Sequence, residues 1–267
     1  MAWYRKKDYD KAIADYSEAI KLDPKDAVAY GNRGDTWKAK GEIDKALADY
    51  DMQISLDPKN DLARGYRGVA WMEKQQFDKA IADYSEAIRL DPKKAWFYSY
   101  RSWAYRSKGE LELALADADR SIQVNPKDAD GWINRGKAYR RLGQFEKALA
   151  DFKHVLDADA NSVSALSALA WLKSTSPDAN FRDGKSALAY AKRVAELSGD
   201  KDGWALDTLA VAYAENGEFK QAQEAETRAI ELISGEKYKQ DCRKQLEVFT
   251  QNKPFREEIK RPKAKTP

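Results

Sequence analysis

The chain of 267 residues contains a single cysteine and a single histidine. Because Cys242 is alone, no intramolecular disulfide can form. Cysteine usage therefore does not indicate whether the protein works in an oxidising or a reducing compartment. His154 has no partners at the spacing that a metal site or a histidine-based triad requires. Glycine-rich phosphate loops and nucleophile elbows are also absent. The sequence therefore predicts no catalytic residue, no metal site and no cofactor, which favours a protein that is not an enzyme.

Long apolar runs are missing as well. Charged residues make up 34% of the chain, and no apolar run approaches the ~20 residues that cross a bilayer. The net charge of +3 comes from the C-terminal end, because residues 253–267 carry six Lys/Arg against two Glu. The rest of the chain is close to neutral, which is a poor electrostatic footprint for nucleic acid. We expect neither membrane insertion nor nucleic-acid binding, and a basic, disordered tail over residues 251–267.

What the sequence contains in quantity is repetition. The segment "KAIADYSEAI" at residues 11–20 returns unchanged at 79–88, and related segments occupy 45–54, 113–122 and 147–156. Single residues keep the same step of 34 positions: Pro24, Pro58, Pro92 and Pro126; Asp15, Asp49, Asp83, Asp117 and Asp151; Arg33, Arg67, Arg101 and Arg135. A fixed period of this length predicts a solenoid in which each unit contacts only its neighbours.

Each unit is predicted to contain two helices. The second helix has an apolar face of period 3.6 and ends at an Asp-Pro pair, because proline lacks an N–H and restricts the residue before it. The next helix then begins at an N-cap residue, for which the sequence offers Asp26, Asn60, Asp128 and Ser162. That first helix ends at Gly41, Gly109 or Gly143, and Gln75 replaces the glycine once.

The pattern resembles the tetratricopeptide repeat. The second unit carries the residues of that motif in order: Tyr30, Gly34, Trp37, Gly41, Ile43, Ala46, Tyr50 and Pro58. The resemblance implies an all-α fold, a right-handed α-solenoid of stacked antiparallel helix pairs with about six to seven repeats and a C-terminal capping helix. The stretched sixth unit and the segment "NKPFRE" are similar to the C-terminal arrangement of many bacterial members.

This period divides the chain into one repeat domain and a tail. The domain is predicted to span residues 1–250, with an incomplete first unit and an irregular sixth. The predicted units are 1–26 (partial), 27–60, 61–94, 95–128, 129–162, 163–202 (irregular) and 203–235, followed by a capping helix over 236–250 and the tail over 251–267.

The Arg and Asp series have two readings. They could form a basic ladder for acidic ligands, or a row of partly buried, hydrogen-bonded pairs that hold the stacked hairpins in register. We prefer the structural interpretation, because Arg33 and its copies adjoin the small residue on the packing side of the first helix.

The fourth unit departs most from the repeat. Residues 95–105, "AWFYSYRSWAY", hold six aromatics, of which the motif requires only Tyr98 and Tyr105. At about 100° per residue, Trp96, Tyr100 and Trp103 fall on the opposite helix face. In the resembled family, this face lines the concave groove in which peptides often bind.

The neighbouring first helices extend this predicted groove. Its residues pass from apolar and aromatic to amide and basic, which suits a protein or peptide segment of apolar and acidic character. The predicted binding residues are Leu62, Tyr66, Val69, Trp96, Tyr100, Trp103, Asn134, Lys137 and Arg141. The alternative is that the chain itself covers these aromatics.

Two further questions stay open at this point. The incomplete first unit leaves an apolar helix face without its full partner, so a second copy could cover it in a homodimer, and the chain would then be a self-assembling structural protein.

A cytoplasmic location is favoured. A periplasmic one stays open because the sequence starts in the middle of an expected helix, and a signal could precede it.

Overall fold

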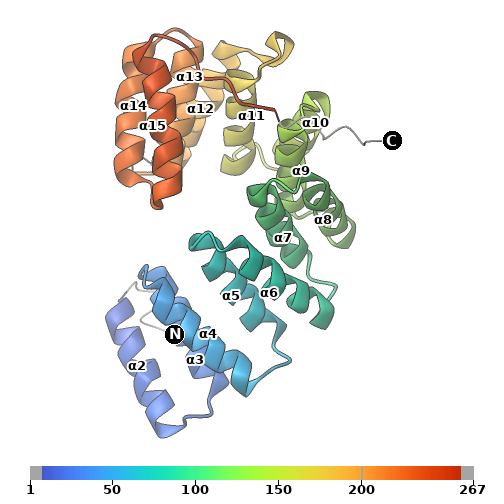
Figure 1. Cartoon of the computed structure of the whole chain (residues 1–267), viewed down its shortest axis with the longest axis vertical. Coiled ribbons are helices and arrows are strands. Elements are labelled where there is room, and N and C mark those ends of the chain that lie inside the picture. Colours follow the sequence, from blue (N-terminus) through green and yellow to red (C-terminus); the bar gives the residue numbers. More distant parts are fainter. Residues whose placement is uncertain (1–7, 200, 260–267) are drawn as a thin grey trace. The chain divides into compact units, whose positions relative to one another are not determined.

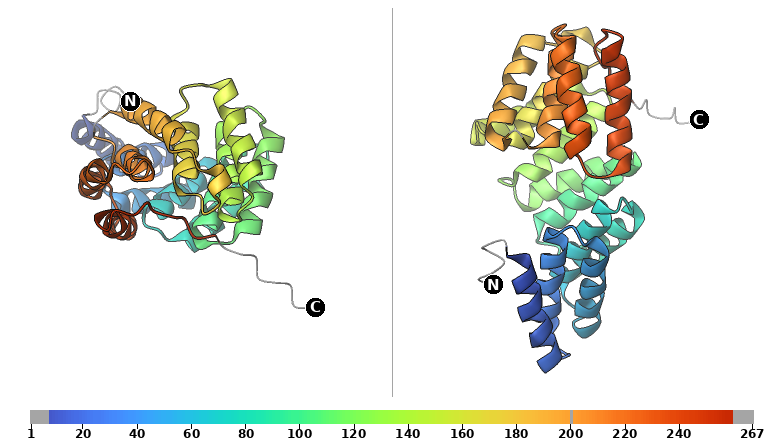
Figure 2. Two further views of the ribbon diagram at one scale, coloured as in Figure 1. Left: turned by 90° about the horizontal axis from the view of Figure 1, so that it is seen from above. Right: turned by 90° about the vertical axis from the view of Figure 1, so that its left-hand side faces the viewer.

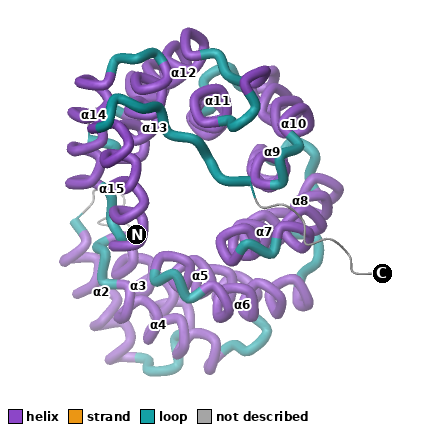
Figure 3. The backbone as a smooth tube through the Cα atoms, turned by 45° about the horizontal axis from the view of Figure 1, so that its top comes forward, coloured by secondary structure: helices purple, strands orange, loops and turns teal. Residues whose placement is uncertain are grey.

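The computed structural model describes residues 8–199 and 201–259. Within those ranges every regular element is helical, with fourteen α-helices, one short 3-10 helix and no strand (Figure 3). The chain divides into two compact halves, residues 1–131 and 132–267, which are called the first and the second unit from here on, as distinct from the 34-residue repeats. The single repeat domain over residues 1–250 stays a prediction.

The first unit contains the regular repeats. Its helices, coloured blue to green in Figure 1, are α2 (Tyr9–Leu22), α3 (Ala27–Ala39), α4 (Ile43–Leu56), α5 (Asp61–Glu73), α6 (Phe77–Leu90), α7 (Ala95–Lys108) and α8 (Leu111–Val124), followed by the start of α9 (Ala129–Arg141). The first helices of the repeats, α3, α5 and α7, start 34 residues apart, as the sequence predicts. Each helix packs on the next one along the chain, and α5 also contacts α3 and α7.

Local chemistry sets these boundaries. The Asp26 carboxylate accepts hydrogen bonds from the N–H groups of Val28 and Ala29, and Asn60 accepts one from Ala63. Side chains that satisfy the first N–H groups of a helix stabilise it at that point. The turn after α5 is less favourable, because Gln75 has a φ of +56° where the other repeats place glycine.

The Arg and Asp series form a ladder of ion pairs. Arg67 donates from Nε and Nη2 to the two carboxylate oxygens of Asp83, at 2.8 and 2.6 Å. Its Nη1 donates to Asp51 of the preceding repeat at 2.7 Å. The same two-point pairing recurs at Arg33–Asp49, Arg101–Asp117 and Arg135–Asp151. The structural interpretation of these series is confirmed.

The second unit is less regular. Besides most of α9 it contains α10 (Phe145–Ala158), α11 (Val163–Thr175), the 3-10 helix η1 (Ala179–Phe181), α12 (Gly184–Ser198), α13 (Gly203–Glu215), α14 (Phe219–Leu232) and α15 (Glu236–Thr250). The last three helices stand side by side at the orange and red end of the chain (Figure 2). Asp183 caps α12 by accepting from the Ser186 N–H, whereas Ser162, a predicted N-cap, makes no side-chain cap on α11.

The segment that follows α15 departs from the sequence prediction of a disordered tail. Residues 253–259 run in an extended conformation from α15 past α11 to α9 (Figure 3). The Glu257 N–H donates to the Thr175 carbonyl at 2.9 Å, and Arg256 donates to the Ser174 carbonyl at 3.1 Å. These bonds and the burial of Phe255 against Trp171 hold the segment in place. Residues 260–267 lie outside the described residues.

Candidate partner-binding face

Helix α7 presents its extra aromatics as half-buried side chains. Phe97 and Tyr98 are buried in the repeat, whereas Trp96, Tyr100 and Trp103 keep part of their surface exposed. The three half-buried rings pack against the cluster formed by Met72, Ala80, Tyr84 and Ala104. The chain itself therefore covers these three aromatic side chains in part, through the adjacent helices of the first unit.

Close contact with α5 fixes the position of Trp96. A Cβ atom on Gly65 would lie 2.3 Å from Trp96 Cη2 and 2.5 Å from Phe97 Cε1, so only glycine leaves room for the rings. The next residue of α5 is Tyr66, and its ring stacks on Trp96 with centroids 5.9 Å apart. Tyr100 then meets Trp96 edge-on at 5.7 Å. These geometries are the favourable ones for aromatic pairs, so the row is preorganised.

The row continues into exposed apolar side chains. Leu62 and Tyr66 on α5 are 37% and 36% exposed, and Val28 on α3 is 65% exposed. Val69, also predicted as a binding residue, is half-buried against the α7 aromatics. We define the first-helix face of the first unit as Val28, Leu62, Tyr66, Val69, Trp96, Tyr100 and Trp103.

Acidic groups flank this face. Burial raises the pKa of Asp35 on α3, and the hydrogen bond donated by the Tyr50 hydroxyl at 2.6 Å only partly opposes the rise. Burial likewise raises the pKa of Glu73 on α5. The Lys38 ammonium lies 5.9 Å from the centre of the Tyr66 ring, within cation–π range. The face is thus an apolar and aromatic surface with a few charges at its border.

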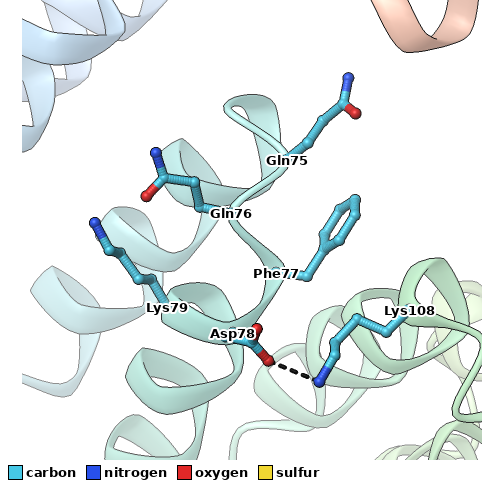
Figure 4. Close-up of a pocket in the computed structure, with 6 residues that line it drawn as sticks. All are labelled: Gln75, Gln76, Phe77, Asp78, Lys79 and Lys108. Carbon is cyan, nitrogen blue, oxygen red and sulfur yellow. Dashed lines mark ion pairs between the residues drawn. The ribbon is translucent and has the colours of Figure 1, made fainter.

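A shallow hollow of about 300 Å³ lies at the end of the second hairpin, away from the predicted residues. Figure 4 shows its lining: Gln75, Gln76, Phe77, Asp78, Lys79 and Lys108. Its only marked interaction is the ion pair between Lys108 and Asp78, at 2.7 Å. The same Lys–Asp contact joins Lys74 to Asp44 one repeat earlier, so the pair belongs to the repeat architecture and does not identify a ligand site.

The amide and basic residues of the prediction, Asn134, Lys137 and Arg141, lie half-buried on α9 in the second unit. The side chain of their neighbour Arg140 is 12% exposed and pairs with Glu257 of the C-terminal segment, its Nε 3.0 Å from Oε2. Burial lowers the pKa of the Arg140 guanidinium, and the Glu257 carboxylate opposes that change. Sequence reasoning missed Glu257, which lies 117 positions away and carries no local signal of this contact.

Comparison with known proteins agrees with this architecture. A sequence profile described as "Tetratricopeptide repeat" matches residues 101–173, and one described as "TPR repeat" matches residues 2–38 and 68–101. The chain belongs to the tetratricopeptide repeat family. A search of curated protein sequences found no match.

Solved structures show the same fold. A tetratricopeptide repeat protein from Parabacteroides merdae superimposes with a TM-score of 0.74 at 16% identity, over 93% of this chain and 95% of that one. The Cut9–Hcn1 structure of the APC/C gives 0.72 at 15% identity, over 91% of this chain and 47% of that one. MamA gives 0.55 at 25% identity, over 60% of this chain and 93% of that one. At such identities these likenesses establish the fold.

The family assignment carries a general functional statement. Tetratricopeptide repeat proteins are in general non-enzymatic scaffolds that bind protein or peptide partners. In the described part of the chain, no helix combines the length and apolarity needed to cross a membrane.

Proposed function

We propose that this chain is a non-enzymatic scaffold that binds a segment of a partner protein on the first-helix face of its first unit. The exposure of Leu62 and Tyr66 beside the half-buried Trp96 carries the proposal. Aromatic side chains held rigidly by their own neighbours lose little entropy on binding and are common anchors of interfaces. The ligand class is therefore a peptide with large aliphatic or aromatic side chains.

The second unit shows how such a face can hold an extended segment. Residues 254–259 lie against α9, α11 and α13 through one apolar anchor, Phe255, two ion pairs of Arg256 and Glu257, and a backbone hydrogen bond. The acidic part of the predicted ligand agrees with this arrangement, since Glu257 is the residue that meets the basic end of α9. Asn134, Lys137 and Arg141 of α9 belong to the second unit, and we propose them as a separate contact for an acidic group.

The test is peptide selection on two matched variants. A random peptide library is selected against the wild-type chain and against the variant Leu62→Ser with Tyr66→Ala. Both residues are partly exposed, so their loss should leave the fold intact. The matched control is Leu113→Ser on α8, a residue 50% exposed on a second helix. We expect the wild type and the control to enrich the same peptides with large apolar residues, and the double variant to bind them at least about 10-fold more weakly.

Equal binding by all three proteins would place the site elsewhere. Replacing Trp96 or Trp103 is a weaker test, because these rings also pack in the core and their loss would lower stability. A pull-down from cell extract with the same three proteins would then identify the natural partner.

Self-assembly is the second candidate function. Ile13 and Tyr16 on α2 are half-buried, and Leu22 at the end of that helix is 80% exposed. A second copy could cover this surface. Light scattering at high micromolar concentration decides the point, since a monomeric mass there would contradict the homodimer. The cytoplasmic location and the absence of nucleic-acid binding stay predictions.

A further inference from the structure

Three adjacent helices of the second unit bring four polar side chains together in an apolar setting. Asp207 comes from α13, Glu226 from α14, and Cys242 and Gln245 from successive turns of α15. All four are almost fully buried, with exposed fractions of 6%, 0%, 2% and 5%. One carboxylate oxygen of Asp207, one of Glu226 and the Cys242 sulfur lie within 4.8 Å of one another. Leu206, Ala229 and Ile233 form the apolar wall beside the thiol.

The polar atoms of this cluster are incompletely satisfied. By hydrogen-bond geometry neither carboxylate oxygen of Glu226 has a partner among the described residues, and its nearest polar neighbour is the weakly donating Cys242 thiol. The Gln245 side chain donates to the Asp207 carboxylate, while its amide oxygen has no partner there. The thiol of Cys242 lies 3.9 Å from Asp207 Oδ1, which is a weak contact. Buried polar atoms without partners cost about 1–3 kcal/mol each, so native proteins seldom keep several in one place. Their convergence therefore indicates a group that would satisfy them together.

We propose that Asp207, Glu226 and Cys242 form a structural site for a thiophilic divalent metal ion of the Zn²⁺ class. A thiolate with two carboxylate ligands suits Zn²⁺, whereas Mg²⁺ and Ca²⁺ prefer six or more oxygens. The Gln245 side chain, a hydrogen-bond partner of Asp207, would orient that carboxylate toward the ion. The ion would join α13, α14 and α15 at the end of the second unit.

Burial favours the protonated forms of these groups when no metal ion is bound. Burial, with the neighbouring negative charge, raises the pKa of Asp207 to about 7 and that of Glu226 to about 9. Burial and the same two carboxylates also raise the pKa of the Cys242 thiol. Each group that binds the ion as an anion must release its proton to solvent. Metal binding therefore releases protons and strengthens as the pH rises from 6 to 8.

The test titrates the untagged, metal-free chain with Co²⁺ as a spectroscopic probe for Zn²⁺, in a buffer without thiols. Cys242 is the only cysteine, so a thiolate-to-metal absorption band in the near ultraviolet reports this residue alone. We expect one Co²⁺ per chain, displacement by one Zn²⁺, and a higher melting temperature for the loaded protein. Calorimetry in buffers of different ionisation enthalpy should show proton release on Zn²⁺ binding.

Variants separate this site from accidental binding. Cys242→Ala should abolish the band, Glu226→Gln should weaken binding about 100-fold or more, and Gln245→Leu should weaken it about 10- to 100-fold. Glu226→Gln keeps the shape and removes a buried ionisable group, so its fold, checked by circular dichroism, should persist. The matched control Glu224→Gln changes an exposed residue of the same helix and should bind as the wild type does.

Three results would overturn the proposal. One is the absence of both a band and stoichiometric Zn²⁺ binding, which would make the cluster a proton-sharing carboxyl pair. Another is undiminished affinity in Glu226→Gln. The third is binding that survives Cys242→Ala and disappears with His154→Ala, because His154 is exposed and would then hold a surface ion only.

Discussion

The two units use the faces of their first helices differently. In the first unit the face of α3, α5 and α7 leaves Val28, Leu62 and Tyr66 exposed, next to the aromatic row of α7. In the second unit the corresponding helices α9, α11 and α13 carry the chain's own C-terminal segment, anchored by Phe255 and Glu257. The comparison indicates that one architecture can leave this face open, as in the first unit, or cover it with a segment of the same chain, as in the second.

The interiors of the units differ as well. Buried charges in the first unit are paired by the repeat itself, through the bidentate Arg–Asp ladder. In the second unit Asp207 and Glu226 are buried without a lysine or arginine among their described contacts. Stability should therefore depend on different variables in the two units.

The largest expected effect is the pH dependence of the second unit in the metal-free chain. The folded-state pKa values of Asp207 and Glu226, about 7 and 9, lie above their ordinary values, so the folded state holds more protons than the unfolded state between about pH 4 and 9. This contribution to stability is complete at the low end of that range and is lost as the pH rises through 7 and 9.

We expect the free energy of unfolding of the second unit to fall by about 3 kcal/mol or more between pH 5 and 9, since one pKa unit corresponds to about 1.4 kcal/mol. Denaturant melts with EDTA present would measure it. Glu226→Gln should flatten the profile and Glu224→Gln should leave it unchanged. A wild-type profile that is already flat would contradict the assignment.

The second largest expected effect is the loss of stability when one Arg–Asp ion pair of the first unit is broken. Arg67→Ala leaves the carboxylate of Asp83, 5% exposed, without its cation. Breaking a buried pair by removing one partner costs about 3 kcal/mol. Thermal melting should show this loss with little change in peptide affinity. Arg89→Ala is the matched control, because its pair with Glu86 is exposed to solvent and should contribute little to stability.

The C-terminal segment offers a comparable test in the second unit. Glu257→Gln removes the negative partner of the buried Arg140 and should destabilise this unit by about 2 kcal/mol. Hydrogen exchange should then increase in α9 and α11, while α3 to α6 keep their protection. Glu258→Gln, at an exposed neighbouring position, serves as the control. Unchanged exchange in α9 and α11 would mean that the segment does not hold these helices.

A pair of glycine substitutions tests the packing of the aromatic row. In Gly65→Ala the new methyl group would meet the rigid rings of Trp96 and Phe97, and overpacking of this kind costs about 1–3 kcal/mol. In Gly31→Ala, the equivalent position of α3, the methyl group meets only the end of the flexible Gln53 side chain. That change should be neutral or stabilising, since alanine is the better helix former. Equal melting temperatures for the two variants would contradict this account of the Trp96 position.

The smallest expected effect concerns the turn after α5. Gln75 has a φ of +56°, where Gly41 and Gly109 occupy the same place in other repeats. Gln75→Gly should raise stability by about 0.5 kcal/mol, because it removes the left-handed strain at the cost of chain entropy. Denaturant melts can detect a change of this size. A loss of stability would show that the Gln75 side chain contributes contacts that outweigh the strain.

Much of the fold could be predicted because its signals are local and repeated. The 34-residue step, the N-caps Asp26 and Asn60, and the Arg–Asp pairing all follow from residues that recur at a fixed spacing.

The candidate face was predictable in part. Helical periodicity separated Trp96, Tyr100 and Trp103 from the other face of α7, but the packing of Trp96 on Gly65 depends on how two neighbouring helices approach.

By itself, the sequence determined the helix pairs, their register and the family, because the turn residues and the Arg–Asp pairs recur at a fixed spacing. Only the tertiary structure decided that Phe255 and Glu257 return to α11 and α9, and that Asp207, Glu226 and Cys242 meet in one buried cluster. These contacts join residues from separate helices whose spacing follows no period. Their energy comes from burial and charge pairing, which depend on the folded arrangement and leave no local pattern in the chain.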